Sequence, residues 1–217
     1  MTEPVTAVVP LRDGSSGKSR LAAGLDAGAR RRLVVALARH VLEALAASRS
    51  VARVVVVTAD MPFAREVAAR VGSPRPGRPS AVPTWPRPAD LIAEPPGGPG
   101  LNAALEHARS HVGDGRLLMV HADLPLLTTD DVDAVAAEPA DIVVATDRHG
   151  TGTNLLRVPA GAPFAFRFGP GSRTAHETEA AAHGLTCAVV QRPGTAADLD
   201  TLDDLAELAP ASATRGL

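Results

Sequence analysis

Tyrosine is absent from this sequence of 217 residues, and aromatic residues make up only 2 % of it. With Trp85 as the single tryptophan, an aromatic platform that stacks nucleic-acid bases has little support. Positive charge is not in excess either, because 22 Lys and Arg stand against 24 Asp and Glu, for a formal net charge of −2. No overall positive field would hold the chain on a nucleic acid or an anionic membrane, so neither is expected as a partner.

Cysteine and long apolar runs are also scarce. Cys187 is the only cysteine, which excludes an internal disulfide and a Cys-rich zinc site and suits a reducing compartment. Met1 to Val5 shows no basic region followed by an apolar stretch, and no apolar run approaches the roughly 20 residues that cross a bilayer. A cytoplasmic location is therefore expected.

The length and a hydrophobic content of 45 % favour one domain over residues 1–217. Six apolar, β-branched runs predict strands at Val5–Leu11, Arg53–Thr58, Leu117–Val120, Asp141–Thr146, Thr153–Val158 and Leu185–Gln191. Helical patterns lie between and after them, at Ala29–Ala47, Pro62–Val71, Leu101–His111, Thr128–Ala136, Ser172–His183 and Leu202–Ala209. This alternation predicts an α/β fold with a mainly parallel central sheet and helices on both faces.

Two segments fall outside this pattern. Residues 73–99 are rich in Pro and Gly and predict an extended connection with at most a short strand near Leu91–Ala93. This connection would be either a surface insertion or a flap over the site. Residues 210–217 are expected to form a loose tail.

Ligands of open α/β sheets bind at the carboxyl ends of the strands. The residues directly after each predicted strand are therefore the candidates for chemistry. Pro10 and Leu11 end the first strand, His121–Pro125 follows a later one, and Thr146–Arg148 follows another. Pro10 and Leu11 thereby become candidates for nucleotide binding.

The loop after the first strand contains Gly17-Lys18-Ser19, which invites comparison with the phosphate-binding loop of P-loop kinases. That motif requires a Gly five positions before the Gly of its Gly-Lys pair, and Arg12 stands there. A P-loop kinase therefore stays only an alternative. Backbone N–H groups of this turn, together with Arg12, Lys18 and Arg20, would suit a triphosphate, whereas the alternative is a flexible loop with solvated charges.

Three aspartates predict a metal site. Asp123 directly follows a strand, and Asp198 and Asp200 have the i, i+2 spacing that places both carboxylates on one face of an extended segment. Magnesium favours a few carboxylates together with phosphate and water oxygens. Two structural alternatives remain open at this point: Asp200 would cap the last helix, and Asp123 would serve as a turn residue.

Taken together, these residues resemble the guanylyltransferases of deazaflavin coenzyme F-420 biosynthesis, which activate 2-phospho-L-lactate or phosphoenolpyruvate. The matching motifs run almost the full length of the chain. They are Lys18-Ser19-Arg20-Leu21, Gly100-Leu101-Asn102-Ala103-Ala104-Leu105, Ala122-Asp123-Leu124-Pro125, Gly152-Thr153-Asn154, Phe168-Gly169 with Ser172 and His176, and Asp198-Leu199-Asp200-Thr201.

The resemblance implies a GT-A-like nucleotidyltransferase fold, related to molybdenum-cofactor guanylyltransferases, which remain an alternative function. It implies that Asp123, Asp198 and Asp200 bind Mg²⁺, with two ions favoured over one. It also implies that GTP is the donor. It also implies that Thr153, Gly169 and Ser172 surround the phosphorylated three-carbon acid. Because Pro170-Gly171 lengthens the turn as in actinobacterial members, phosphoenolpyruvate is favoured over 2-phospho-L-lactate as the acceptor.

The remaining expectations concern residues that would support this chemistry. Lys18 and Arg20 are expected to stabilise the reacting phosphates as catalytic residues, with Arg12 beside them. Arg148 would pair with the acceptor carboxylate, or form a surface ion pair. Asn102 would contact the nucleotide, or cap its helix. His176 would orient Ser172, or be a satisfied histidine, and the sheet edges leave room for a homodimer.

Overall fold

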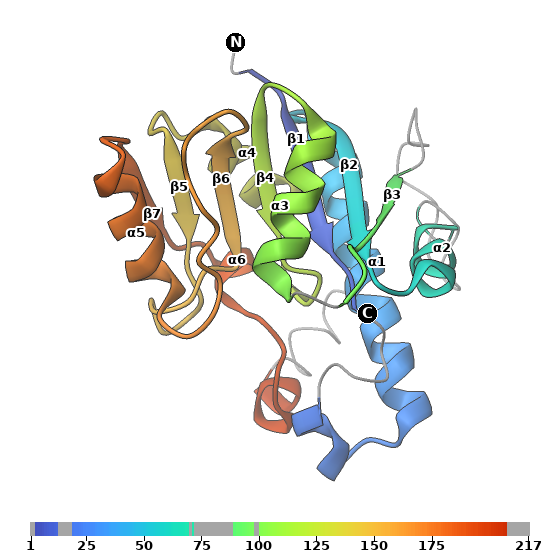
Figure 1. Cartoon of the computed structure of the whole chain (residues 1–217). Helices are drawn as coiled ribbons and strands as arrows, with labels where there is room; N and C mark the ends of the chain where they lie inside the picture. The colour runs from blue at the N-terminus through green and yellow to red at the C-terminus, as the bar shows by residue number, and fades with distance from the viewer. Residues whose placement is uncertain (1–2, 13–18, 70, 72–88, 98–99, 208–217) are drawn as a thin grey trace.

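A seven-stranded sheet organises the chain (Figure 1). The computed structural model describes residues 3–12, 19–69, 71, 89–97 and 100–207. The strands are β1 Val5–Pro10, β2 Val51–Thr58, β3 Asp90–Ala93, β4 Arg116–Val120, β5 Ile142–Ala145, β6 Leu155–Pro159 and β7 Cys187–Val190. They lie in the order β3-β2-β1-β4-β6-β5-β7. Strand β6 is antiparallel to both of its neighbours, β4 and β5, while every other pairing is parallel.

Helices cover both faces of this sheet. They are α1 Ala27–Ala47, α2 Met61–Ala69, α3 Leu101–Val112, α4 Thr129–Ala137, α5 Ser172–Ala182 and the short α6 Pro193–Ala196, with a 3-10 turn η1 at Ser19–Ala23. One core cluster packs α1, α2 and α4 against one face, and a second packs α3, α5 and three phenylalanines against the other. Burial of a sheet on both faces explains why β2 reads as a continuous apolar run.

A third, smaller cluster lies where α1 extends beyond the sheet (Figure 1). Leu21, Leu37 and Leu199 are its buried members, so it joins the segment after the first loop, helix α1 and the last segment of the chain. These three segments are far apart in sequence. Their packing fixes the position of Leu199, and therefore of the two aspartates beside it.

The predicted architecture is confirmed, and the element boundaries differ by a few residues. The short strand expected inside the 73–99 connection is present as β3. Two elements were not predicted, η1 and α6, since both are too short to show a periodic pattern. The last predicted helix is helical over 202–207. The rest of that helix, the tail 210–217 and most of the 73–99 connection lie outside the described residues.

Within the ranges that the structure describes, no helix combines the length and the apolar character needed to span a membrane.

Candidate functional site

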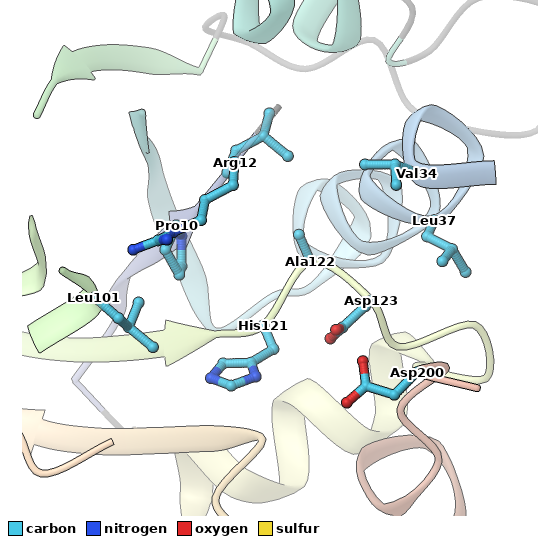
Figure 2. A pocket seen from close by; sticks show the side chains of 10 residues that line it. Pro10, Arg12, Val34, Leu37, Leu101, His121, Ala122, Asp123 and Asp200 are labelled. Atoms are coloured by element: carbon cyan, nitrogen blue, oxygen red, sulfur yellow. The ribbon is translucent and has the colours of Figure 1, made fainter. Parts of the chain in front are cut away.

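A cavity of about 450 Å³ opens at the carboxyl ends of β1 and β4. Because parallel strands end at the same edge of a sheet, the residues that follow them converge there. Its lining residues are Pro10, Leu11, Arg12, Val34, Leu37, Leu101, His121, Ala122, Asp123 and Asp200 (Figure 2). A volume of this size lies within the range typical of small-molecule sites, roughly 300 to 1,000 Å³.

Asp123 and Asp200 meet at one side of this cavity, and Figure 2 shows their carboxylates pointing toward each other. The backbone explains the meeting, because the N–H of Leu199 donates a hydrogen bond to the carbonyl oxygen of Asp123 over 3.1 Å. The Leu199 side chain is 2 % exposed and packs into the small third cluster. The alternation predicted from sequence is thereby confirmed for Leu199, which is buried while Asp200 faces the cavity.

Asp198 of the same segment contacts Asn154, the residue before β6. Its Oδ1 lies 3.4 Å from the side-chain nitrogen of Asn154, which also donates to the carbonyl of Thr195 over 2.9 Å. Burial is the main cause that raises the pKa of Asp198, and the negative charges of Asp123 and Asp200 raise it further. Three carboxyl groups that repel each other in this way are a donor set that a cation would stabilise.

The residues present therefore fit magnesium chemically. Among the described residues, however, no group of three or more His, Cys, Asp and Glu side chains is already gathered tightly enough to count as a metal-binding cluster. The assignment of Asp123, Asp198 and Asp200 to magnesium consequently remains a proposal.

The helix cap at the end of the chain is formed by Thr201 rather than by Asp200. The Thr201 hydroxyl accepts from the N–H of Asp204, and the Asp204 carboxylate accepts from the N–H groups of Thr201 and Asp200. This reciprocal arrangement is a capping box. The capping role that sequence left open for Asp200 is therefore wrong, because the box begins one residue later.

Arg148 contacts the C-terminal segment. Its guanidinium donates to the backbone carbonyl of Asp198 over 3.0 Å and forms ion pairs with Asp204 at 2.9 Å and Glu207 at 2.8 Å. Of the two roles considered from sequence, this geometry favours the ion pair over contact with an acceptor carboxylate. Arg148 thus anchors the segment that carries Asp198 and Asp200.

Asn102 hydrogen-bonds to the backbone of a residue far away in the sequence. Its amide nitrogen donates to the carbonyl of Phe168 over 3.0 Å, and its amide oxygen accepts from the Phe168 N–H over 2.8 Å. The N-cap of α3 is Gly100, so the capping alternative for Asn102 is wrong. Asn102 holds the backbone immediately before Gly169. Its contact with the nucleotide stays a prediction.

The three residues expected around the acceptor occupy neighbouring positions. Ser172 begins α5, and its hydroxyl lies 3.1 Å from that of Thr153. Both side chains are 3 % exposed. Gly169 is exposed, with φ of 143° and open space around the position of a side chain. A left-handed φ of this kind is accessible mainly to glycine, so Gly169 shapes the turn that leads into α5.

A row of rings connects these residues with the cavity. His121, which lines the cavity, lies 5.4 Å from Phe168, and Phe168 lies 4.9 Å from His176, measured between ring centroids. The sequence placed His121 in the candidate range His121–Pro125 without giving it a specific role, and it did not identify Val34, Leu37 and Leu101 as lining residues. Of these three, only Leu101 could have been found from the sequence, because it belongs to the Gly100–Leu105 motif. Val34 and Leu37 show only the ordinary apolar spacing of a helix.

The basic residues are only partly described. Arg12 is exposed and lines the cavity, and its contact with phosphate stays a prediction. Lys18 lies outside the described residues. The backbone of Arg20 belongs to η1, while its side chain is not described. The catalytic roles of Lys18 and Arg20 therefore stay predictions.

Solved structures named as nucleotidyl-transferring enzymes share this fold. A nucleotidyl transferase from Methanothermobacter matches with a TM-score of 0.66 at 16 % identity, covering 98 % of this chain and 99 % of that one. A CMP:2-keto-3-deoxy-manno-octonic acid synthetase complexed with CTP matches with a TM-score of 0.61 at 12 % identity, covering 98 % and 100 %. Identities this low show the fold alone.

Sequence relatives are much closer. A phosphoenolpyruvate guanylyltransferase from Sphaerobacter thermophilus is 40 % identical over 94 % of this chain and 91 % of its own length. One from Roseiflexus castenholzii is 39 % identical over 94 % and 87 %. A 3-phospho-D-glycerate guanylyltransferase from Phenylobacterium zucineum is 38 % identical over 94 % and 88 %.

The family model described as "Guanylyl transferase CofC like" matches residues 89–211, which include all three site aspartates, Asn102, Thr153 and Ser172. This match does not support the P-loop kinase alternative, which the spacing around Arg12 had already weakened. With more than half of the chain matched and relatives near 40 % identity over most of its length, the chain belongs to the CofC-like guanylyltransferase family.

Proposed function

We propose that this guanylyltransferase transfers GMP from GTP to phosphoenolpyruvate, or to 2-phospho-L-lactate, for deazaflavin coenzyme F-420 biosynthesis. The products are pyrophosphate and, with phosphoenolpyruvate, enolpyruvoyl-2-diphospho-5'-guanosine. The names of the relatives support phosphoenolpyruvate, while one relative is named for 3-phospho-D-glycerate. The structural observation that carries the proposal is the meeting of Asp123 with Asp200 at the cavity, fixed by the Leu199 hydrogen bond.

In the proposed reaction, a phosphate oxygen of the acceptor attacks the α-phosphorus of GTP. The new bond joins that oxygen to the α-phosphorus, and the bond from the α-phosphorus to the bridging oxygen breaks, so the electron pair leaves with pyrophosphate. A phosphate monoester has a second pKa of about 6, so its attacking oxygen is already largely ionised at pH 7. No general base is needed.

The remaining difficulty is electrostatic, since two anions must approach each other. Asp123, Asp198 and Asp200 would hold Mg²⁺, which when bound neutralises phosphate charge and orients the attacking and leaving oxygens. Arg12 lines the same cavity and would bind a phosphate of the donor. Lys18 and Arg20 are proposed to stabilise the departing pyrophosphate, and Pro10 and Leu11 to contact the nucleotide.

The apolar part of the cavity would exclude water. Val34 and Leu37 of α1 and Leu101 of α3 are the apolar side chains that line it in Figure 2. Water must be kept from the α-phosphorus, because hydrolysis of GTP to GMP would compete with transfer to the acceptor.

The test offers the protein GTP and Mg²⁺ with phosphoenolpyruvate, 2-phospho-L-lactate and 3-phosphoglycerate in parallel reactions. Pyrophosphate release together with a guanylylated acid of the expected mass supports the proposal, and the acid that reacts fastest identifies the acceptor. Formation of GDP and a doubly phosphorylated acid would contradict it, since that result means phosphoryl rather than guanylyl transfer.

A further inference from the structure

Three buried side chains, two of which are expected to surround the acceptor, form a short hydrogen-bonded chain. The Ser172 hydroxyl lies 3.1 Å from the Thr153 hydroxyl, and the Thr153 oxygen lies 3.0 Å from Nδ1 of His176. Their side chains are 3 %, 3 % and 0 % exposed, in the same order. Ser172 and His176 occupy one face of α5, four residues apart, while Thr153 directly precedes Asn154 and β6.

A hydrogen bond from the Arg167 backbone sets the direction of these hydrogen bonds. The backbone N–H of Arg167 donates to Nε2 of His176 over 3.0 Å. A neutral imidazole has one donor nitrogen and one acceptor nitrogen, so the proton of His176 must sit on Nδ1. His176 therefore donates to Thr153. Burial is the main cause that lowers the pKa of His176, to about 4, which keeps the ring neutral at pH 7.

Because His176 donates to Thr153, one hydroxyl proton of the Thr153 and Ser172 pair has no partner within the trio. The Thr153 oxygen accepts from His176, and one hydrogen bond joins the two hydroxyls, so either Thr153 or Ser172 retains an O–H that the trio does not use. His176 cannot accept that proton, because its acceptor nitrogen is already engaged by Arg167. The hydroxyl pair therefore offers one O–H as a hydrogen-bond donor, and an anion is a hydrogen-bond acceptor.

We propose that His176 is a positioning residue that holds Thr153 and Ser172 as hydrogen-bond donors toward the anionic acceptor of guanylyl transfer. This assignment rests on the proposed function. Its location supports it, since the exposed turn Gly169–Gly171 leads directly into α5 and the ring of Phe168 connects His176 with cavity-lining His121.

A purely structural role for His176 would act through a different contact. The ring accepts the Arg167 N–H and packs against Phe164 and Phe168, so it also stabilises the segment before Gly169. The two roles use different ring nitrogens, and two substitutions separate them. The amide nitrogen of Asn takes the place of Nδ1 and preserves donation to Thr153. The longer Gln places its amide near Nε2 and preserves the contact with Arg167.

The experiment measures KM for the acceptor, KM for GTP, kcat and Tm in wild type, His176→Asn and His176→Gln. We expect the acceptor KM to rise about tenfold in His176→Gln and to stay within about threefold in His176→Asn, with the GTP KM unchanged in both. The reverse order would overturn the proposal, because it would show that the Arg167 contact matters instead.

Arg109→Met is the matched control. The Arg109 guanidinium donates to the backbone carbonyls of Ala160, Ala162 and Phe164, so its loss loosens the same segment without touching Thr153. A selective rise in acceptor KM in this variant would also overturn the proposal. Should His176→Gln fail to fold, Thr153→Ser and Thr153→Val ask the same question, and an unchanged acceptor KM in Thr153→Val would overturn the assignment.

Failure of the proposed function has a separate signature. If wild type guanylylates none of the three acids, that function is wrong and the role of His176 falls with it. If wild type is active while the acceptor KM of His176→Gln is unchanged, only the role of His176 is wrong.

Discussion

The N–H of Leu199 donates to the carbonyl oxygen of Asp123 over 3.1 Å, and this bond joins the end of β4 to the last segment of the chain. It places two carboxylates from distant parts of the sequence at one cavity. Because the bond uses backbone groups, the Asp123 and Asp200 side chains take no part in it. Substitution of those carboxylates should therefore affect chemistry more than folding.

Asp123→Asn, and separately Asp198→Asn, should lower kcat by at least about a hundredfold with little change in Tm, since a proposed magnesium ligand is lost while the core stays intact. Pyrophosphate release and thermal unfolding measure the two effects. Asp203→Asn is the control, because Asp203 is an exposed aspartate of the same segment. Equal losses of activity and of Tm would argue for a structural role.

Arg148→Met distinguishes the role expected from sequence from the one that the structure favours. Loss of the contacts with Asp198, Asp204 and Glu207 should raise the Mg²⁺ concentration for half-maximal rate by about three- to tenfold, because the aspartate segment becomes less ordered. The acceptor KM should change little. A magnesium titration at saturating acceptor, followed by an acceptor titration at saturating magnesium, measures both. A large rise in acceptor KM alone would restore the role in acceptor binding.

Asn102→Ala removes two hydrogen bonds to the Phe168 backbone. We expect a loss of about 1 to 3 kcal/mol in the free energy of unfolding, because buried backbone groups lose their partner. The acceptor KM should rise, since Gly169 follows Phe168, while the GTP KM should change less. Urea unfolding and the two KM values test this expectation. A rise confined to the GTP KM would favour the nucleotide contact that sequence suggested.

Gly194→Ala should destabilise the protein by about 1 to 3 kcal/mol through overpacking. A side-chain carbon at Gly194 would lie 2.6 Å from the carbonyl oxygen of Leu126 and would also overlap the Asp131 carboxylate. Gly161→Ala is the control, because a carbon there meets nothing within 4 Å. Chemical denaturation of both variants gives the comparison, and equal stabilities would show that α6 shifts at little cost.

Stability should depend on pH through His176. Its pKa is about 4 in the folded protein against 6.5 ordinarily, chiefly because the ring is buried, with the charges of Arg167 and His121 adding to the shift and Glu179 opposing it. Below pH 6.5 the unfolded chain binds a proton that the folded chain does not. The stability that neutral His176 contributes is thus fully present above pH 6.5, and it is lost as the pH falls toward 4.

Between pH 7 and pH 5 this loss should amount to about 2 kcal/mol in the free energy of unfolding. Urea unfolding of wild type and His176→Asn at pH 7 and pH 5 isolates the effect, since the carboxylates are common to both proteins. Parallel pH dependence in the two proteins would contradict the assignment.

Local sequence patterns predict the strands of the sheet, its long helices and the position of Asp123 at a strand end. Apolar periodicity and burial on both faces follow from local patterns, so they are readable without a structure. The order of the motifs was enough to indicate the family, and the i, i+2 spacing around Leu199 was enough to indicate which residue of the three is buried.

The partners of the polar side chains, in contrast, become visible only in the folded structure. Arg148 meets the carbonyl of Asp198, 50 residues away, and Asn102 meets Phe168, 66 residues away. His176 meets Thr153 rather than Ser172 through its ring. Such partners depend on how loops from different strands converge at the sheet edge. Since the hydrogen bonds of a long polar side chain are satisfied by whichever groups the packing brings near, no local pattern encodes them.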